Sequence, residues 1–209
     1  MINVKNKKIK IIDFGSSEFN NIKDNHKKTY IVTRYYRAPE IVYGCGYNFT
    51  IDIWSLGCIL FELICDFPLF KSSCEQDLVY KISELIGIPD LNRYHETHTF
   101  DKFWVLKPNH NENMYYYKND DYQHDPISFD YEFRHSLMTE KIKYTTPRKF
   151  KLKPYLYNEL KKKIKTKLHL KFTVNFLAKI LIYDFEKRPT AEDCITDLIF
   201  LETKLNTKI

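Results

Sequence analysis

Glycine is scarce in this sequence, with only five residues among 209. A glycine-rich loop can hold a phosphate because glycine lets several backbone N–H groups approach the anion closely. No G-x-G-x-x-G pattern occurs among the five glycines, which are Gly15, Gly44, Gly46, Gly57 and Gly87. A phosphate-binding loop of this type is therefore excluded from these 209 residues.

Cysteine pairs and long apolar stretches are also missing. The five cysteines form no C-x-x-C pair and have no metal-ligand spacing, so we expect reduced thiols in an intracellular protein of the nucleus or cytoplasm. The most apolar stretch, residues 53–61, has nine residues, whereas a membrane-spanning helix needs about 20. The first residues contain no apolar run typical of a secretory signal. We expect no membrane partner.

The length and composition fit one domain, but the charge is uneven. With 44% hydrophobic residues, the 209-residue chain can fill a sizeable core. Residues 141–171 contain twelve Lys or Arg and one acid, Glu159, a net charge of +11 against +6 for the whole chain. This stretch is a candidate surface for an acidic partner. A solvated face is the commoner alternative, and the excess of Lys over Arg argues against nucleic acid.

Three short motifs follow one another in the first third of the chain. They are Asp13-Phe14-Gly15, then Ala38-Pro39-Glu40, then the block D-I-W-S-L-G at residues 52–57. One tripeptide carries little information, because such matches arise by chance. In this order and spacing, the three motifs indicate the activation segment of a protein kinase.

On these motifs the chain resembles the CMGC group of serine/threonine kinases, and within it the DYRK family or the neighbouring splicing kinases. The closer resemblance lies in I-K-I-I-D-F-G-S-S at 9–17, T-Y-I at 29–31, R-Y-Y-R at 34–37 and F-P-L-F at 67–70. It implies a serine/threonine or dual-specificity protein kinase that transfers the ATP γ-phosphate to protein substrates. Mg²⁺ and ATP are the implied cofactors, and a loop tyrosine would be autophosphorylated.

Asp13 is the candidate metal ligand. Residues 9–12 form a β-branched run typical of a strand, and Asp13 is the first acid after it. A carboxylate at a strand end, followed by a glycine that lets the chain turn, can face a divalent cation from a fixed position. Phosphoryl transfer needs such a cation to offset the charge on the phosphate oxygens. A turn aspartate before a glycine is the alternative for Asp13 taken alone.

By the resemblance, Tyr30 is the regulatory tyrosine of the segment. A phosphotyrosine brings almost two negative charges. Arg34 and Arg37, four and seven residues later, would order the loop through charge-assisted hydrogen bonds to it. The alternative for Tyr30 is an aromatic side chain packed in a loop. Thr33 matches the threonine that lies beside the catalytic aspartate and helps position the substrate hydroxyl.

Three further residues match structural positions of the family. Glu40 of the A-P-E motif would pair with Arg188, which lies in the matching sequence Y-D-F-E-K-R-P-T at 183–190. Asp52, in the first turn of a central helix, would receive backbone hydrogen bonds from the catalytic loop. The alternatives are two unrelated surface charges for the pair and an ordinary helix N-terminal acid for Asp52.

The expected fold is mainly α: a protein-kinase-like C-terminal lobe with a short β-hairpin at the start and the N-lobe absent. Residues 1–209 would be a partial kinase domain. Its parts are a strand pair (1–12), the activation segment (13–40), central helices (41–90), a partly disordered CMGC-type insert (91–170) and closing helices (171–209). Residues 50–65 are apolar nearly all round and predict a buried central helix with Thr50 as N-cap. Other helices are predicted at 75–86, 172–183 and 191–201, the last beginning with a capping box at Thr190.

The sequence contains no H-R-D-x-x-x-x-N catalytic loop and no V-A-I-K lysine. By the resemblance, the base aspartate is expected upstream of Met1, so no catalytic residue is assigned in this chain and the N-lobe is a missing partner. Because phosphoryl transfer needs several groups positioned together, we expect these 209 residues alone to be inactive. They are then a fragment of an active kinase or a kinase-derived remnant. A non-catalytic scaffold and a basic-patch binding module are the alternatives.

Overall fold

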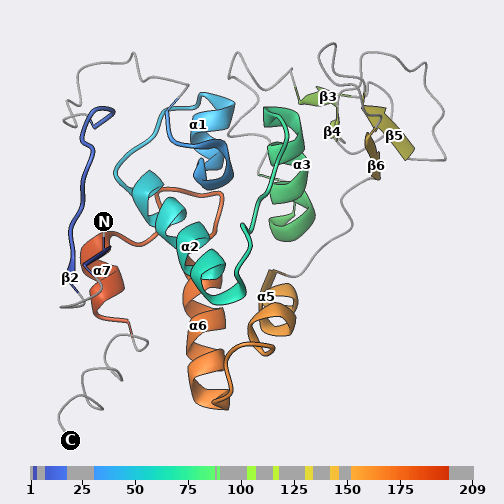
Figure 1. The fold of residues 1–209 in the computed structure, drawn as a ribbon. Helices are drawn as coiled ribbons and strands as arrows, with labels where there is room; N and C mark the ends of the chain where they lie inside the picture. The colour runs from blue at the N-terminus through green and yellow to red at the C-terminus, as the bar shows by residue number, and fades with distance from the viewer. Residues whose placement is uncertain are drawn as a thin grey trace, which may run out of the picture.

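The computed structural model describes residues 2–3, 8–17, 31–87, 89, 103–106, 115–117, 130–133, 142–145 and 152–197 (Figure 1). Most of the described chain is helical, as expected for a kinase lobe. The helices are the 3-10 turn η1 (Arg34–Tyr36), α1 (Pro39–Tyr43), α2 (Thr50–Cys65), α3 (Glu75–Ile86), α5 (Leu152–Leu160), α6 (Lys167–Ile180) and α7 (Ala191–Ile195). No helix in the described part is long and apolar enough to cross a membrane.

Short antiparallel strand pairs make up the rest of the regular structure. β1 (Ile2–Asn3) pairs with β2 (Lys8–Ile9), β3 (Trp104–Leu106) with β4 (Tyr115–Tyr117), and β5 (Asp130–Phe133) with β6 (Ile142–Thr145). The predicted opening hairpin is present, but β2 ends at Ile9, and residues 10–14 continue without strand pairing. The sequence between 107 and 135 showed no steady period, so the strands in it were not predicted. Most of that stretch lies outside the described residues.

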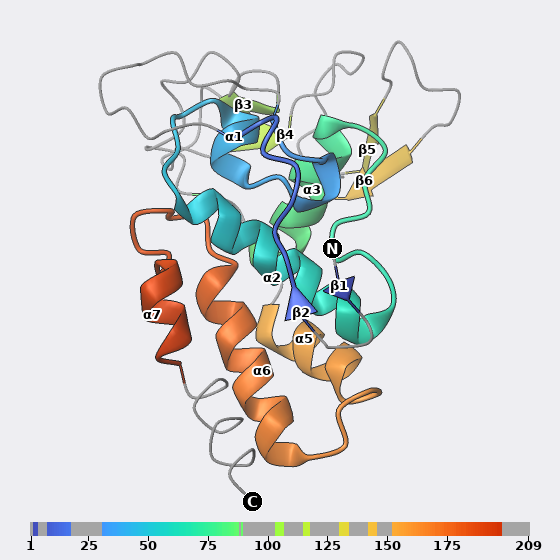
Figure 2. The same ribbon diagram turned by 60° about the vertical axis from the view of Figure 1, so that its left-hand side comes forward.

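Helix α2 lies at the centre of the helical part, between α1 and α6 (Figures 1 and 2). Its side chains Trp54, Cys58 and Phe61 are buried, and the Trp54 ring stacks on Phe70 with 5.6 Å between ring centroids. Gly57 allows α6 to approach closely, because a Cβ at this position would lie 3.0 Å from the Ile180 side chain. A larger residue would push the two helices apart in a core that is already close-packed.

One face of α2 contradicts the prediction of a helix buried all round. Leu56, Ile59 and Leu63 lie on that face at helical spacing and are 44%, 42% and 70% exposed. The described residues of the chain cover these three side chains only in part. The apolar pattern was detected correctly, but an all-apolar helix does not reveal which of its faces the same chain covers.

The helix ends show which capping signals were read correctly. The capping box at the start of α7 is confirmed: Thr190 Oγ1 accepts a hydrogen bond from the Asp193 N–H (3.2 Å), and Asp193 Oδ2 accepts one from the Thr190 N–H (2.9 Å). Thr50 is not the N-cap of α2, because Phe49 holds that position and Asn48 Oδ1 accepts from the Thr50 N–H (2.9 Å). Helix α6 begins at Lys167, before the predicted 172, and α7 ends at Ile195, before the predicted 201.

Candidate functional site

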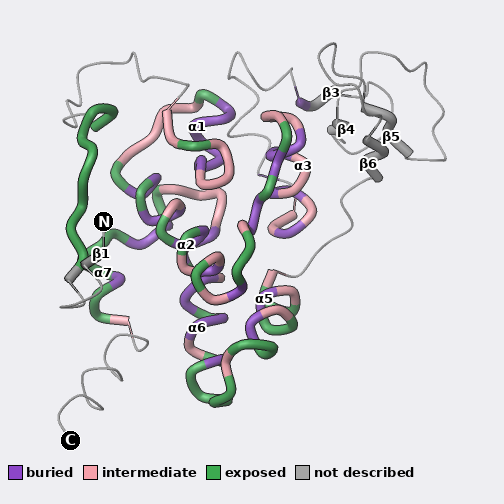
Figure 3. Tube along the Cα trace, in the orientation of Figure 1, coloured by how far each residue is buried: buried purple, intermediate pink, exposed green. Residues whose placement is uncertain are grey.

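The DFG arm, residues 10–17, leaves β2 and runs along the outside of the molecule. Figure 3 shows it exposed throughout, and in Figure 2 it crosses in front of α2. Three large apolar side chains of the arm, Ile11, Ile12 and Phe14, are exposed. The arm therefore presents the predicted metal ligand on an accessible segment, together with apolar surface that the described residues leave uncovered.

Asp13 has a left-handed backbone, with φ of 63°. Such a value is uncommon for a residue with a Cβ, although Asp and Asn adopt it more readily than most. Asp13 Oδ1 accepts a hydrogen bond from the Gly15 N–H at 3.3 Å, and the Ser17 N–H donates to the Phe14 carbonyl at 3.0 Å. These local bonds turn the chain at the motif and engage one carboxylate oxygen of Asp13. No hydrogen bond to its other carboxylate oxygen is found among the described residues.

The chemistry of Asp13 fits a magnesium site that is completed by other groups. Mg²⁺ is usually held by one or two carboxylates together with waters and substrate phosphates, rather than by a full set of protein ligands. The described residues contain no group of three His, Cys, Asp or Glu side chains that could hold a metal ion. Asp13 would supply one carboxylate oxygen.

Arg37 fixes the backbone in the second half of the activation segment. Its buried guanidinium donates Nε to the Ile31 carbonyl (3.0 Å), Nη2 to the Val32 carbonyl (3.1 Å) and Nη1 to Glu75 Oε1 (2.6 Å). Val32 has φ of 65°, which is a strained value for a β-branched residue. Strain of this kind persists only where neighbouring contacts enforce it, and it is concentrated at functional sites. The hydrogen bonds from Arg37 to the Ile31 and Val32 carbonyls hold Val32 in this conformation.

Thr33 follows Val32 and is exposed. Its carbonyl accepts from the Tyr36 N–H at 3.0 Å, while its hydroxyl has no hydrogen-bond partner among the described residues. Tyr36 ties this turn to α2, because its hydroxyl donates to Glu62 Oε2 (2.7 Å) and its carbonyl accepts from Ser55 Oγ (2.8 Å). The bond to Glu62 also raises the pKa of Tyr36. Thr33 is thus presented on a well-fixed turn.

The predicted phosphotyrosine-binding arginines both lie against the start of α3. Arg34 donates Nη1 to the Ser73 carbonyl (2.5 Å), and its buried Nε has no partner in the described structure. Arg37 reaches Glu75, in the first turn of α3. Tyr30 itself lies outside the described residues. The pairing of Glu75 with Arg37 was not predicted from the sequence, because a pair separated by 38 positions leaves no periodic signal.

Glu40 and Arg188 form a bidentate pair in the interior. Arg188 Nη1 donates to Glu40 Oε1 (2.6 Å) and Nη2 donates to Oε2 (3.0 Å), with both side chains 0% exposed. Arg188 also donates to the carbonyls of Thr50 (3.0 Å) and Ile182 (2.8 Å), and its guanidinium lies 5.2 Å from the Trp54 ring centroid. The pair joins the end of the activation segment to α2 and to the chain after α6.

Asp52 lies in the first turn of α2, four residues before Leu56 on the uncovered face. It is exposed, and no hydrogen-bond or ion-pair partner for its carboxylate is found in the described part of the chain. Partial burial raises its pKa. The structure thus separates the predicted residues into an anchored group (Arg37, Glu40, Arg188) and an exposed group (Asp13, Thr33, Asp52).

Comparison with known proteins agrees with this arrangement. A family model described as the protein kinase domain matches residues 1–200. The dual specificity tyrosine-phosphorylation-regulated kinase mbk-2 of Caenorhabditis elegans is 51% identical over 81 residues, which cover 39% of this chain and 10% of that protein. The DYRK-family kinase pom1 of Schizosaccharomyces pombe is 48% identical over 82 residues, or 39% and 7% of the two chains.

A third relative extends the same result to a mammal. The dual specificity tyrosine-phosphorylation-regulated kinase 3 of Rattus norvegicus is 52% identical over 82 residues, or 38% of this chain and 13% of that protein. The aligned residues thus span about a tenth of the length of these relatives. From the family model and these relatives, the chain belongs to the protein kinase family, in its DYRK-like, CMGC branch.

Proposed function

We propose that these residues are part of the catalytic domain of a protein kinase that transfers the ATP γ-phosphate to Ser or Thr side chains of proteins and autophosphorylates a loop tyrosine. The observation that carries this is the activation segment itself. Asp13 is exposed at one end of it, while Arg37, Glu40 and Arg188 anchor the other end within the helical core. We also propose an intracellular location, in the nucleus or cytoplasm, which the five free cysteines support.

In this proposal each residue of the segment has one task. Asp13 would hold Mg²⁺, and the bound ion would supply positive charge to the transferred phosphoryl group. Thr33 presents its free hydroxyl toward the substrate hydroxyl, from the turn that Tyr36 fixes to α2. Arg34 and Arg37 receive the phosphate of phosphorylated Tyr30. Glu40 and Arg188 hold the end of the segment against α2 and take no part in the reaction.

We further propose that the rest of the kinase domain packs on the uncovered face of α2 and on the DFG arm. Leu56, Ile59 and Leu63 are exposed in a row, and Asp52 adds a carboxylate without a described partner. Covering apolar surface contributes about 25 cal/mol per Å², and backbone N–H donors would satisfy Asp52. The catalytic base and the nucleotide pocket belong to those additional residues.

The isolated 209-residue chain is expected to transfer no phosphate. Its sequence contains no catalytic-loop motif and no phosphate-binding lysine motif, and positioning by several groups together accounts for most of the catalysis. The measurement is phosphate incorporation into a Ser/Thr peptide library with ATP and Mg²⁺, for the purified chain and for the full-length protein. Transfer by the purified chain would contradict the proposal. An inactive full-length protein would favour the non-catalytic scaffold.

Replacing Tyr30 with Phe in the full-length protein is expected to lower kinase activity by about tenfold or more, equal to about 1.4 kcal/mol in the barrier. The phenol oxygen that carries the phosphate is lost, and with it the charge that would order the segment. Tyr35→Phe is the matched control, because it removes the same atom five positions away. Phosphotyrosine is followed by mass spectrometry. Equal activity of the wild type and the Tyr30→Phe variant would remove the regulatory role.

A further inference from the structure

Lysines gather at the turn that joins α5 to α6. Five of the seven residues from 161 to 167 are lysines, and we name Lys161, Lys162, Lys163, Lys165 and Lys167 the lysine turn. All five side chains are exposed. Figure 1 places this turn at the lower end of the helical part, away from the DFG arm and from α3. The proposed kinase reaction makes no use of it.

The lysine turn has a fixed backbone. The N–H groups of Lys161 and Lys163 donate to the carbonyls of Tyr157 and Leu160, both at 3.0 Å, and the Ile164 N–H donates to the Leu160 carbonyl at 2.8 Å. Ile164 packs against the hydrophobic core. The lysines are therefore displayed from a defined turn, which distinguishes them from a charged run in a flexible tail.

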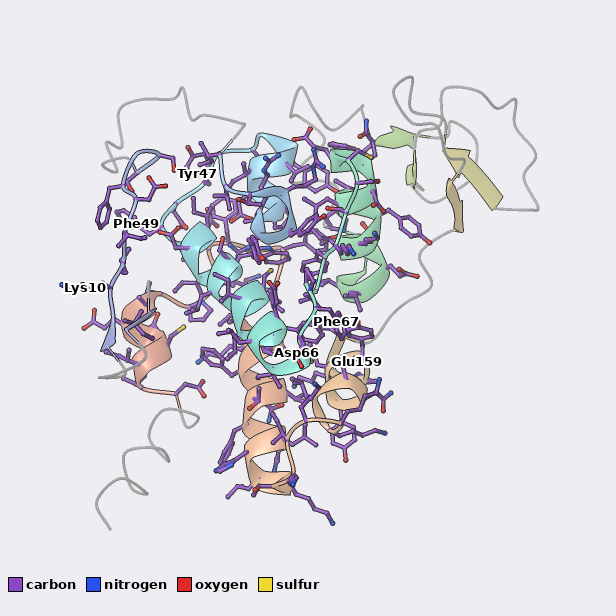
Figure 4. All side chains as sticks on the ribbon, viewed as in Figure 1. Lys10, Tyr47, Phe49, Asp66, Phe67 and Glu159 are labelled. Atoms are coloured by element: carbon purple, nitrogen blue, oxygen red, sulfur yellow. The ribbon has the colours of Figure 1, made fainter. Side chains whose placement is uncertain are left out.

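Two of these lysines already pair with carboxylates. Lys162 Nζ lies 2.7 Å from Glu159 on α5, and Lys163 Nζ lies 2.5 Å from Asp66 at the end of α2. Figure 4 labels both carboxylates. Lys165 and Lys167 make no ion pair within the described residues. The turn thus has the spacing and reach to bind protein carboxylates, and the carboxylates of the described residues engage only part of it.

The charge of Lys167 also lies at an unfavourable place in the local structure. Lys167 is the first residue of α6, whose first turn contains no acid and whose N-cap Thr166 makes no side-chain capping bond. The N-terminal end of a helix carries a partial positive charge, so a lysine there is unfavourable and a bound anion is favourable. An acidic ligand would relieve this repulsion.

We propose that the lysine turn is a docking surface for an acidic segment of a partner protein that also carries aliphatic residues. Leu168, directly after Lys167, is 48% exposed and can receive an aliphatic side chain. Residues 152–171 contain no arginine, the residue that reads bases and phosphates best. One half-exposed leucine is too little apolar surface to anchor the turn in a lipid bilayer.

The test uses a fluorescein-labelled peptide of Glu with interspersed Leu and the complete 209-residue chain, with binding followed by fluorescence anisotropy. The triple variant Lys161→Gln, Lys165→Gln, Lys167→Gln is expected to bind about tenfold more weakly, and the wild-type affinity should fall with rising salt. The matched control is Lys71→Gln, Lys153→Gln, Lys187→Gln, which removes the same charge from exposed lysines outside the turn. It is expected to stay within about twofold.

Three outcomes would overturn the proposal. The control variant could lose as much affinity as the triple variant, which would mean that net charge alone attracts the peptide. A single-stranded oligonucleotide, or vesicles of phosphatidylcholine and phosphatidylserine, could bind the lysine turn more tightly than the peptide, which would assign the surface to nucleic acid or to membranes.

The far-UV circular dichroism of both variants should match the wild type, because every substituted side chain is exposed.

Discussion

Replacement of Arg188 by Met is expected to lower the free energy of unfolding by about 3–5 kcal/mol. The change leaves the Glu40 carboxylate in the interior without its cation, and it removes the donors that satisfy the Thr50 and Ile182 carbonyls. Removing one partner of a buried pair is costly because the other charge stays desolvated. Urea unfolding of the 209-residue chain, followed by circular dichroism, measures the loss.

Two further variants test whether the loss of stability comes from the burial of the Glu40–Arg188 pair. Lys187→Gln, one residue earlier, breaks an ion pair with Asp184 at 3.1 Å, but the Lys187 side chain is 81% exposed. It should change stability by less than about 0.5 kcal/mol. The double variant Glu40→Met, Arg188→Met removes the stranded charge and should recover part of the loss. A loss below about 1 kcal/mol for Arg188→Met would mean that water reaches the pair.

Asp13→Asn in the full-length protein is expected to lower kcat/KM by about a thousandfold, equal to about 4 kcal/mol in the barrier. Asparagine also tolerates a positive φ and keeps the Oδ1 acceptor for the Gly15 N–H, so the turn is preserved. Only the negative charge that we propose to hold Mg²⁺ is removed. The readout is peptide phosphorylation over a range of Mg²⁺ concentrations, and the loss should shrink as Mg²⁺ rises.

Asp66→Asn is the matched control for this prediction. Asp66 is an exposed aspartate with φ of 67° at the end of α2, so the substitution makes the same chemical change on the same backbone conformation. Among the described residues its carboxylate pairs only with the exposed Lys163, and kinase activity should stay within about twofold. Activity of the Asp13→Asn variant within about threefold of the wild type would remove Asp13 from the metal site.

Much of the helical architecture was readable from the sequence, because it depends on local signals. The apolar run at 50–65 predicted α2 with the bounds Thr50–Cys65, and Thr190 with Asp193 predicted the capping box. The start of α6 was missed because Lys167 and Lys171 interrupt the apolar period that was used to place it. The strands within residues 91–170 were missed for a different reason: each has only three or four residues, too few for a pattern to stand out in a stretch with no steady period.

The candidate site depended on contacts that no local pattern contains. Motif resemblance named Glu40 and Arg188 across 148 positions, and the structure brings them together. Resemblance did not name Glu75 as the partner of Arg37, although its carboxylate lies 2.6 Å from the Arg37 guanidinium. It also did not reveal that Val32 is strained or that Arg37 holds its carbonyl. These features depend on where α3 lies relative to the segment. That position is set by tertiary packing, which short sequence motifs do not encode.

The bond between Arg37 and Glu75 changes how a phosphate on the segment would act. Because Glu75 already supplies an anion to this guanidinium, an arriving phosphate meets a cation that is occupied. The free energy gained on phosphorylation would then be the difference between binding the phosphate and binding the Glu75 carboxylate at the Arg37 guanidinium. Where the phosphate displaces Glu75, the contact that holds α3 to the segment would be lost. If Tyr30 is phosphorylated as we propose, activation would therefore be coupled to the contact between Arg37 and α3.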